Sequence, residues 1–193
     1  MNHSKGHVIE MAWSYATTWI RGVQAFYYRL VEDGSEDTRF FDSKIARYEV
    51  DFNCYLMALR RLERAVGMAL KAWGQPSIDL EQALGDFSQR TPFLADVRNT
   101  NEHFDDYLNE RGRSRNIDSR GMGVLKVTVN GHVIARQGTV IVESVGSVLA
   151  GHKGWTIEWL GYTVELAEST KIAEVLYQAF IRWYEALPDP IPG

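Results

Sequence analysis

The stretch SKIARYEVDFNCYLMALRRLERAVGMALKAW, residues 43–73, decides the fold class that the sequence predicts. Its apolar side chains recur every three or four residues, which is the period of an α-helix with one buried face. Ser43 is a suitable N-cap, and Gly74 followed by Pro76 is a typical helix end. We therefore expect one long amphipathic helix with this apolar face: Ile45, Tyr48, Phe52, Leu56, Leu59, Leu62, Val66 and Leu70.

Two more helices are predicted near the ends of the chain. Residues 8–31 show the helical period, and their expected apolar face is Val8, Met11, Tyr15, Trp19, Val23, Phe26 and Leu30. Residues 168–187 show it again, and their expected apolar face is Ile172, Val175, Leu176, Ala179, Phe180 and Trp183.

Two further helices are predicted between these. Ser77 is positioned to cap a short helix over residues 78–87. Thr91-Pro92 combines an N-cap residue with a proline at the first helical position, and this pair opens a helix that ends near Gly112.

The pattern changes after Gly121, where alternating apolar and polar residues predict strands. LKVTV and HVIARQ flank Asn130-Gly131, a dipeptide typical of a two-residue hairpin turn. TVIVESVGSVL (139–149) and WTIEWLGYTVEL (155–166) predict further strands, with GHKG as the turn between them.

The predicted fold class is therefore mainly α (α+β). A helical bundle is expected from residues 8–112 and 168–187, with a small antiparallel β-meander over about 121–166 inserted before the last helix. Because 193 residues suit one domain, we expect a single domain over residues 1–193.

Composition narrows the class of protein. The net charge of 21 − 25 = −4 argues against coating nucleic acid by bulk charge, although a local basic patch would still bind it. The single cysteine, Cys54, excludes an intramolecular disulfide, and its apolar surroundings predict a buried thiol. No apolar run reaches ~18–20 residues and the N-terminus lacks signal-peptide features, so we expect a cytoplasmic protein. The histidines show no metal-ligand spacing, and no metal or cofactor is expected.

RNTNEH, residues 98–103, is the strongest functional lead. On a helical wheel Arg98 and His103 lie on opposite flanks of the predicted helix, roughly 140° apart. The buried stripe between them is Leu94, Val97, Asn101, Phe104 and Leu108. Metal-free RNA cleavage needs a group with a pKa near 7 to move a proton and a fixed cation to stabilise the charged phosphorus centre. One histidine and one arginine supply both. Because the two point apart, one active site needs two copies of the helix, as in a symmetric dimer.

An arginine, a polar residue and a histidine at this spacing on a helix resemble the motif of the HEPN superfamily. The matching residues here are Arg98, Asn99 and His103. The spacing alone is expected about 1.2 times by chance, and requiring Asn, Asp or His after the arginine lowers that expectation to about 0.14. The resemblance implies a metal-independent endoribonuclease, often a toxin or anti-phage effector, that leaves 2′,3′-cyclic phosphate ends. It also implies a homodimer and a cognate antitoxin or regulatory protein as partner. It does not account for the β-meander.

The segment after the motif favours RNA binding, since its arginines alternate with glycine and serine: Arg111, Arg113, Arg115 and Arg120. Glu102, Asp105 and Asp106 act against it, because carboxylates beside His103 raise its pKa and repel phosphate. Two other interpretations stay open. In the first, the chain is a non-catalytic HEPN-like bundle that binds a protein or a nucleotide. In the second, it is a structural α+β domain in which Arg98 and Glu102 form an ordinary surface ion pair.

Overall fold

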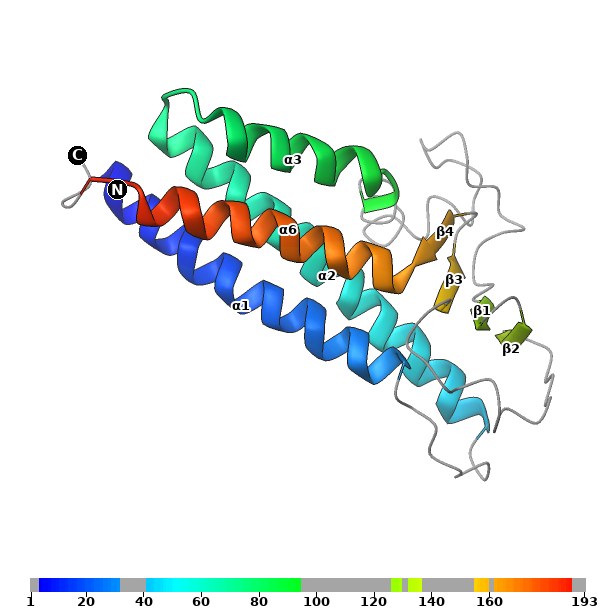
Figure 1. The fold of residues 1–193 in the computed structure, drawn as a ribbon. Coiled ribbons are helices and arrows are strands. Elements are labelled where there is room, and N and C mark those ends of the chain that lie inside the picture. Colours follow the sequence, from blue (N-terminus) through cyan, green and yellow to red (C-terminus); the bar gives the residue numbers. More distant parts are fainter. Residues whose placement is uncertain are drawn as a thin grey trace, which may run out of the picture.

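The computed structural model describes these residues of the chain: 4–31, 41–94, 126–129, 132–136, 155–159 and 162–188. Within them, side chains are described for residues 4–31, 50–94, 156–158 and 163–188. Figure 1 shows the helices side by side, with the strands gathered at one end of the bundle. These helices are α1 (Lys5–Val31), α2 (Phe41–Trp73), α3 (Ile78–Arg90) and α6 (Leu166–Glu185). The predicted mainly α class, with a small antiparallel sheet before the last helix, is confirmed.

α2 is the long helix predicted over residues 43–73, but it begins at Phe41, so Ser43 lies inside the helix and is not its N-cap as predicted. Every described member of its predicted apolar face is buried or half-buried, the buried ones being Phe52, Leu56, Leu59, Leu62 and Val66. Gly74 ends the helix with a φ of 71°, a left-handed conformation that glycine adopts without strain. Its N–H donates to the Leu70 carbonyl at 3.1 Å. Cys54, which was predicted to be buried, is half-buried because it lies at the edge of this face.

The buried face of α1 differs from the predicted one. Met11 and Tyr15 are 38% and 48% exposed. Smaller or neighbouring residues face the core instead, namely Ile9, Ala12, Ala16, Ile20, Val23 and Leu30. The reason lies in the partner helix, because α2 presents its own alanines to α1 and the two backbones approach closely. A methyl group built on Gly22 would lie 3.5 Å from Ala58 Cβ. The larger Met11 and Tyr15 side chains do not fit this seam.

An ion pair also joins α1 to α2. Arg29 Nη2 lies 2.8 Å from Asp51 Oδ1, and Arg29 Nε donates to Asp51 Oδ2 at 3.2 Å. The Asp51 side chain is only 3% exposed, so the two-point contact offsets the cost of removing a carboxylate from water. Arg29 itself stays half-exposed and lies over the Phe26 ring.

α6 begins at Leu166, two residues before the predicted start, and packs on the other flank of α1. Tyr177 and Thr17 share a hydrogen bond of 3.0 Å, and Trp13 stacks on Tyr184 with ring centroids 5.4 Å apart. Val175 departs from the prediction: it was expected on the buried face and is 57% exposed. The apolar stripe of α6 is therefore wider than the surface that the described helices cover.

The sheet contains β1 (Lys126–Val129), β2 (His132–Arg136), β3 (Trp155–Trp159) and β4 (Tyr162–Glu165). All pairs are antiparallel, and the hairpin predicted around Asn130-Gly131 is present as β1 and β2. The spatial order is β2-β1-β3-β4, whereas a simple meander would place β2 next to β3. The strand predicted over residues 139–149 lies outside the described residues.

Ile157 of β3 and Val164 of β4 join the sheet to the helices, since both are buried in the core. That core is one cluster of side chains drawn from all four described helices and from these two strands. None of the helices in the described ranges is long and apolar enough to cross a membrane.

Candidate functional site

The predicted catalytic residues Arg98, Asn99 and His103 lie outside the residues that the structure describes. The predicted RNA-binding residues do so as well: Arg111, Arg113, Arg115 and Arg120. The described chain stops at Leu94, four positions before Arg98. The structure therefore describes the carboxyl end of α3 and the four residues after it, which precede the motif segment.

The start of the motif segment is anchored in the core. Phe93 and Leu94 are 5% and 3% exposed, and Leu94 was predicted on the buried stripe of this segment. The Leu94 N–H donates to the Thr91 carbonyl at 3.1 Å. Thr91 was predicted to cap the next helix, but its hydroxyl donates at 2.7 Å to the Phe87 carbonyl of α3. The Phe87 carbonyl thus accepts twice from Thr91, from its hydroxyl and from its N–H at 3.0 Å, so this buried residue closes α3.

A hydrogen-bonded group ties the last turn of α3 to α2. Ser88 Oγ donates to Glu63 Oε1 at 2.7 Å, and the other oxygen of Glu63 pairs with Arg60 one turn earlier on α2. Glu63 thus accepts from two helices at once. Its negative charge is partly neutralised by Arg60, which is why a half-buried carboxylate is stable between the helices.

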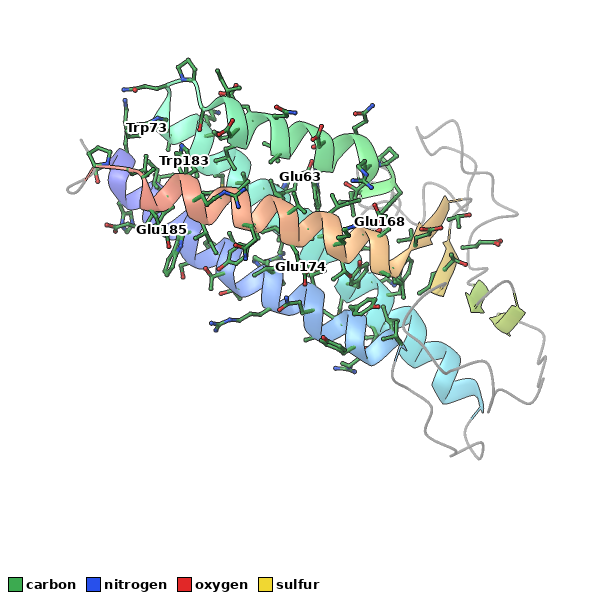
Figure 2. The ribbon with its side chains drawn as sticks, in the orientation of Figure 1. Glu63, Trp73, Glu168, Glu174, Trp183 and Glu185 are labelled. Atoms are coloured by element: carbon green, nitrogen blue, oxygen red, sulfur yellow. The ribbon has the colours of Figure 1, made fainter. Side chains whose placement is uncertain are left out.

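A second contact ties the same turn of α3 to α6. Arg90 forms an ion pair with Glu168 in the first turn of α6, and Figure 2 shows Glu168 near the strand end of that helix. Glu168 also lies where a carboxylate favours the amino end of a helix dipole. Together, Ser88 and Arg90 fix the direction in which the chain leaves α3 toward the motif.

Tyr55 supports this end of the bundle from the inside. Its hydroxyl donates to the Leu166 carbonyl at 3.1 Å and shares a 2.9 Å hydrogen bond with Thr170 Oγ1. Burial raises the pKa of the Tyr55 phenol far above 10.0, although hydrogen bonds with Thr170 and Ser169 act in the opposite direction. Tyr55 therefore stays neutral and serves as a structural link between α2 and the start of α6.

The described side chains around the end of α3 make hydrogen bonds and ion pairs. Among the described residues, no group of three His, Cys, Asp or Glu side chains is arranged to hold a metal ion. His7 is the one histidine whose side chain the structure describes, and α1 begins at the end of the bundle opposite Leu94. A histidine at this end of the bundle is not among the described side chains, and the predicted one, His103, lies outside the described ranges.

A groove of about 790 Å³ between α3 and α6 was not predicted from the sequence. Its apolar lining includes Ile78, which is 76% exposed, and Val175. At the end near the chain termini the Trp73 and Trp183 rings meet edge to face at 6.3 Å, and Figure 2 labels both. One feature of the sequence indicated the groove: the apolar stripe predicted for α6 was wider than one buried face needs. Its extra member, Val175, was assigned to the core instead.

Comparisons with protein-family models, with characterised proteins and with solved structures give no match for this chain. The described residues therefore define the protein as a helical bundle with a small antiparallel sheet. Any functional assignment has to be argued from the residues of this chain.

Proposed function

We propose that this protein is a metal-independent endoribonuclease of the HEPN type, with Arg98, Asn99 and His103 as its active-site residues. The observation that carries the proposal is the Arg98-Asn99-x3-His103 motif on the segment that directly follows α3. Two described features support it. The surrounding fold is a helical bundle, and Phe93 and Leu94 pack the start of the motif segment into its core.

The proposed reaction moves one proton and exchanges two bonds at phosphorus. His103 takes the proton of the ribose 2′-hydroxyl, and the 2′-oxygen forms a bond to the adjacent phosphorus. The bond from phosphorus to the 5′-oxygen breaks, and that oxygen receives the proton that His103 took up, which leaves a 2′,3′-cyclic phosphate, a free 5′-hydroxyl and neutral His103. Arg98 stabilises the charge on the phosphoryl oxygens, and Asn99 orients the phosphate.

Two chains are required in this proposal, because Arg98 and His103 of one helix point in different directions. A homodimer brings Arg98 of one chain to His103 of the other. The arginines after the motif hold the RNA backbone, which makes binding dependent on salt: Arg111, Arg113, Arg115 and Arg120. In a cell, such an activity fits a toxin or an anti-phage effector that is restrained by an antitoxin or regulatory protein.

The direct test is cleavage of a mixed RNA pool by the purified full-length chain, with and without EDTA. We expect cleavage in EDTA, cyclic phosphate ends, and loss of activity in Arg98→Ala and His103→Ala. Arg21→Ala is the matched control, because it removes an exposed arginine of α1 that has no part in positioning the motif segment. Cleavage that survives in both motif variants, or no cleavage by the unmodified chain, would refute the proposal.

A mixing experiment tests the composite site. Arg98→Ala and His103→Ala chains are unfolded together, refolded together and assayed. Half of the random dimers are mixed and each holds one complete site of two, so about a quarter of the original activity should return. If each site takes both residues from one chain, the mixture stays inactive. The non-catalytic interpretation predicts inactivity in every sample.

A further inference from the structure

The α3–α6 groove has walls of opposite charge. Asp79 and Asp86 stand on the α3 wall, and Lys171 and Arg182 stand on the α6 wall. All four side chains are exposed. Within the described part of the chain, the one ion pair that crosses from α3 to α6 is Arg90–Glu168, at the end of the groove. The two pairs of charges along its length are therefore available for a partner.

We propose that a second copy of this chain docks on the groove, with the two-fold axis running along the helices. A two-fold interface must match itself, because each surface patch meets its own copy. One acidic wall and one basic wall meet that requirement, since each acidic wall can face the basic wall of the other copy.

The charges also select the direction of the axis. An axis lying across the helices would place α3 against α3 and α6 against α6, and like charges would face each other. An axis along the helices places each α3 beside the α6 of the other copy. Only this second arrangement pairs opposite charges.

The level of each residue along the groove fits this arrangement. α3 and α6 run in opposite directions, and Arg90–Glu168 fixes their relative height. Asp86, four residues before Arg90, then stands about level with Lys171, three residues after Glu168. Because rotation about an axis along the helices preserves height, Asp86 meets the partner's Lys171. Asp79 lies within the reach of the partner's Arg182 in the same way.

The apolar residues of the groove are complementary as well. Val175 is seven residues after Glu168, and Ala83 is seven residues before Arg90, so they stand at the same height. In the dimer the exposed Val175 side chain faces the partner's Ala83, a large residue against a small one. Pairing of this kind removes Val175 and Ile78 from water, which is the main favourable term in most associations.

The same axis gives the pairing a consequence for activity. It places the carboxyl ends of both α3 helices at one end of the dimer, so both motif segments start from the same end. That link to a composite active site rests on the proposed ribonuclease function, whereas the pairing itself does not.

The test is the molar mass of the full chain in solution, measured by light scattering and by sedimentation. One chain has a mass of 22.0 kDa, and we expect twice that value for the unmodified protein. Asp86→Lys and Lys171→Asp should each raise the dissociation constant about tenfold, because each places like charges together at two symmetric points. The double variant Asp86→Lys/Lys171→Asp should restore the original dissociation constant, since it exchanges the two charges.

Glu10→Lys on α1 and Lys71→Asp on α2 are matched controls, because they make the same charge changes at exposed sites outside the groove. A monomer at tens of micromolar protein, or a dimer that neither single variant weakens, would overturn the inference. So would a double variant that stays as weak as the singles while all variants keep their circular dichroism and melting temperature. A dimer that behaves as expected but cleaves no RNA would leave the inference standing and refute the proposed function.

Discussion

The two helix pairs of the bundle are packed in opposite ways. α1 and α2 approach each other closely at Gly22 and Ala58, where a methyl group added to Gly22 would lie in ordinary contact with Ala58 Cβ at 3.5 Å. α3 and α6 are joined by the Arg90–Glu168 ion pair at one end, and a groove of about 790 Å³ lies between them. At this point the first pair has room for a methyl group and little more, whereas the groove of the second pair has space for larger groups.

This difference shows which part of the molecule holds the fold and which part is available for a partner. Close-packed seams respond to every added carbon atom, because interiors have little free volume. An open groove accepts added carbon atoms at little cost, because they displace only water. The stability of the chain should therefore depend on the α1–α2 seam, and its association should depend on α3 and α6.

The largest effect is expected from adding volume to each pair in turn. Ala58→Leu places three extra carbon atoms in the closed seam and should lower the free energy of unfolding by about 1–3 kcal/mol. Ala83→Leu points the same atoms into the groove and should change it by less than about 0.5 kcal/mol. Urea unfolding at one dilute protein concentration measures both, and equal costs for the two variants would remove the contrast between the pairs.

Ala83→Leu has a second expected result. Because Ala83 is opposite the partner's Val175 in the proposed dimer, the added leucine should weaken the dimer while the single chain stays folded. If the Ala83→Leu chain stays folded and dimerises as before, the partner must lie elsewhere on the surface.

The next effect concerns hydrogen bonds at the core and at the edge. Tyr55→Phe removes a buried hydroxyl that serves Leu166 and Thr170, and should cost about 1–2 kcal/mol. Tyr177→Phe removes the part-buried hydroxyl bound to Thr17, and should cost about 0.5 kcal/mol. Thermal and urea unfolding of the two variants, with Thr170→Val added in a double-mutant cycle, separates the contribution of the Tyr55–Thr170 contact. Equal losses would mean that burial does not set the strength of these bonds.

The same tyrosine predicts a pH dependence. Burial raises the pKa of Tyr55 in the folded state above its unfolded value of 10.0, so the unfolded chain releases this proton first. The contribution of neutral Tyr55 is fully present below pH 10 and is lost as the pH rises above it. The stability gap between the unmodified chain and Tyr55→Phe should therefore narrow above pH 10. A gap that stays constant from pH 8 to 11 would contradict the raised pKa.

The helices could be predicted from the sequence because their period depends on local residues. The burial of Phe52 and Leu59 follows from that period, and the end of α2 at Trp73 follows from Gly74 and Pro76. The face of α1 did not follow, because Met11 and Tyr15 fit the period as well as Ile9 and Ala16 do. The choice between them depends on the alanines of α2, which only the folded pair brings into contact.

The strand order and the groove could not be predicted for the same reason, because both depend on contacts between distant parts of the chain. Alternation predicts that residues 126–129 and 155–159 are strands, but it does not say which sheet edge the second hairpin joins. The groove depends on the relative heights of α3 and α6, and the contact that shows them, Arg90–Glu168, joins residues far apart in the sequence. The motif at Arg98 and His103 is a local signal and was found for that reason. Whether two such motifs meet depends on the dimer.

Alanine substitutions at two glycines should have smaller effects of opposite sign on the free energy of unfolding. Gly22→Ala should stabilise the chain by about 0.5–1 kcal/mol, because alanine favours the helix and its methyl group makes an ordinary contact with Ala58. Gly74→Ala should destabilise it by about 1 kcal/mol, because Gly74 has a φ of 71°. Melting temperatures of both variants check the signs. If Gly22→Ala destabilises the chain, the α1–α2 seam is even tighter than its 3.5 Å contact indicates.

The smallest effect is expected at the ion pair that joins α3 to α6. Arg90 and Glu168 are 54% and 40% exposed, so solvent screens them and Arg90→Ala should cost less than about 1 kcal/mol. Arg21→Ala, at an exposed arginine of α1, is the reference. The difference between the two should disappear in 1 M salt, where the screening length is about 3 Å. A cost above about 2 kcal/mol that persists in salt would mean that this ion pair holds α3 in place. The burial of Phe87 and Leu94 would then matter less than the packing indicates, and the α3–α6 pair would no longer be the loosely held half of the bundle.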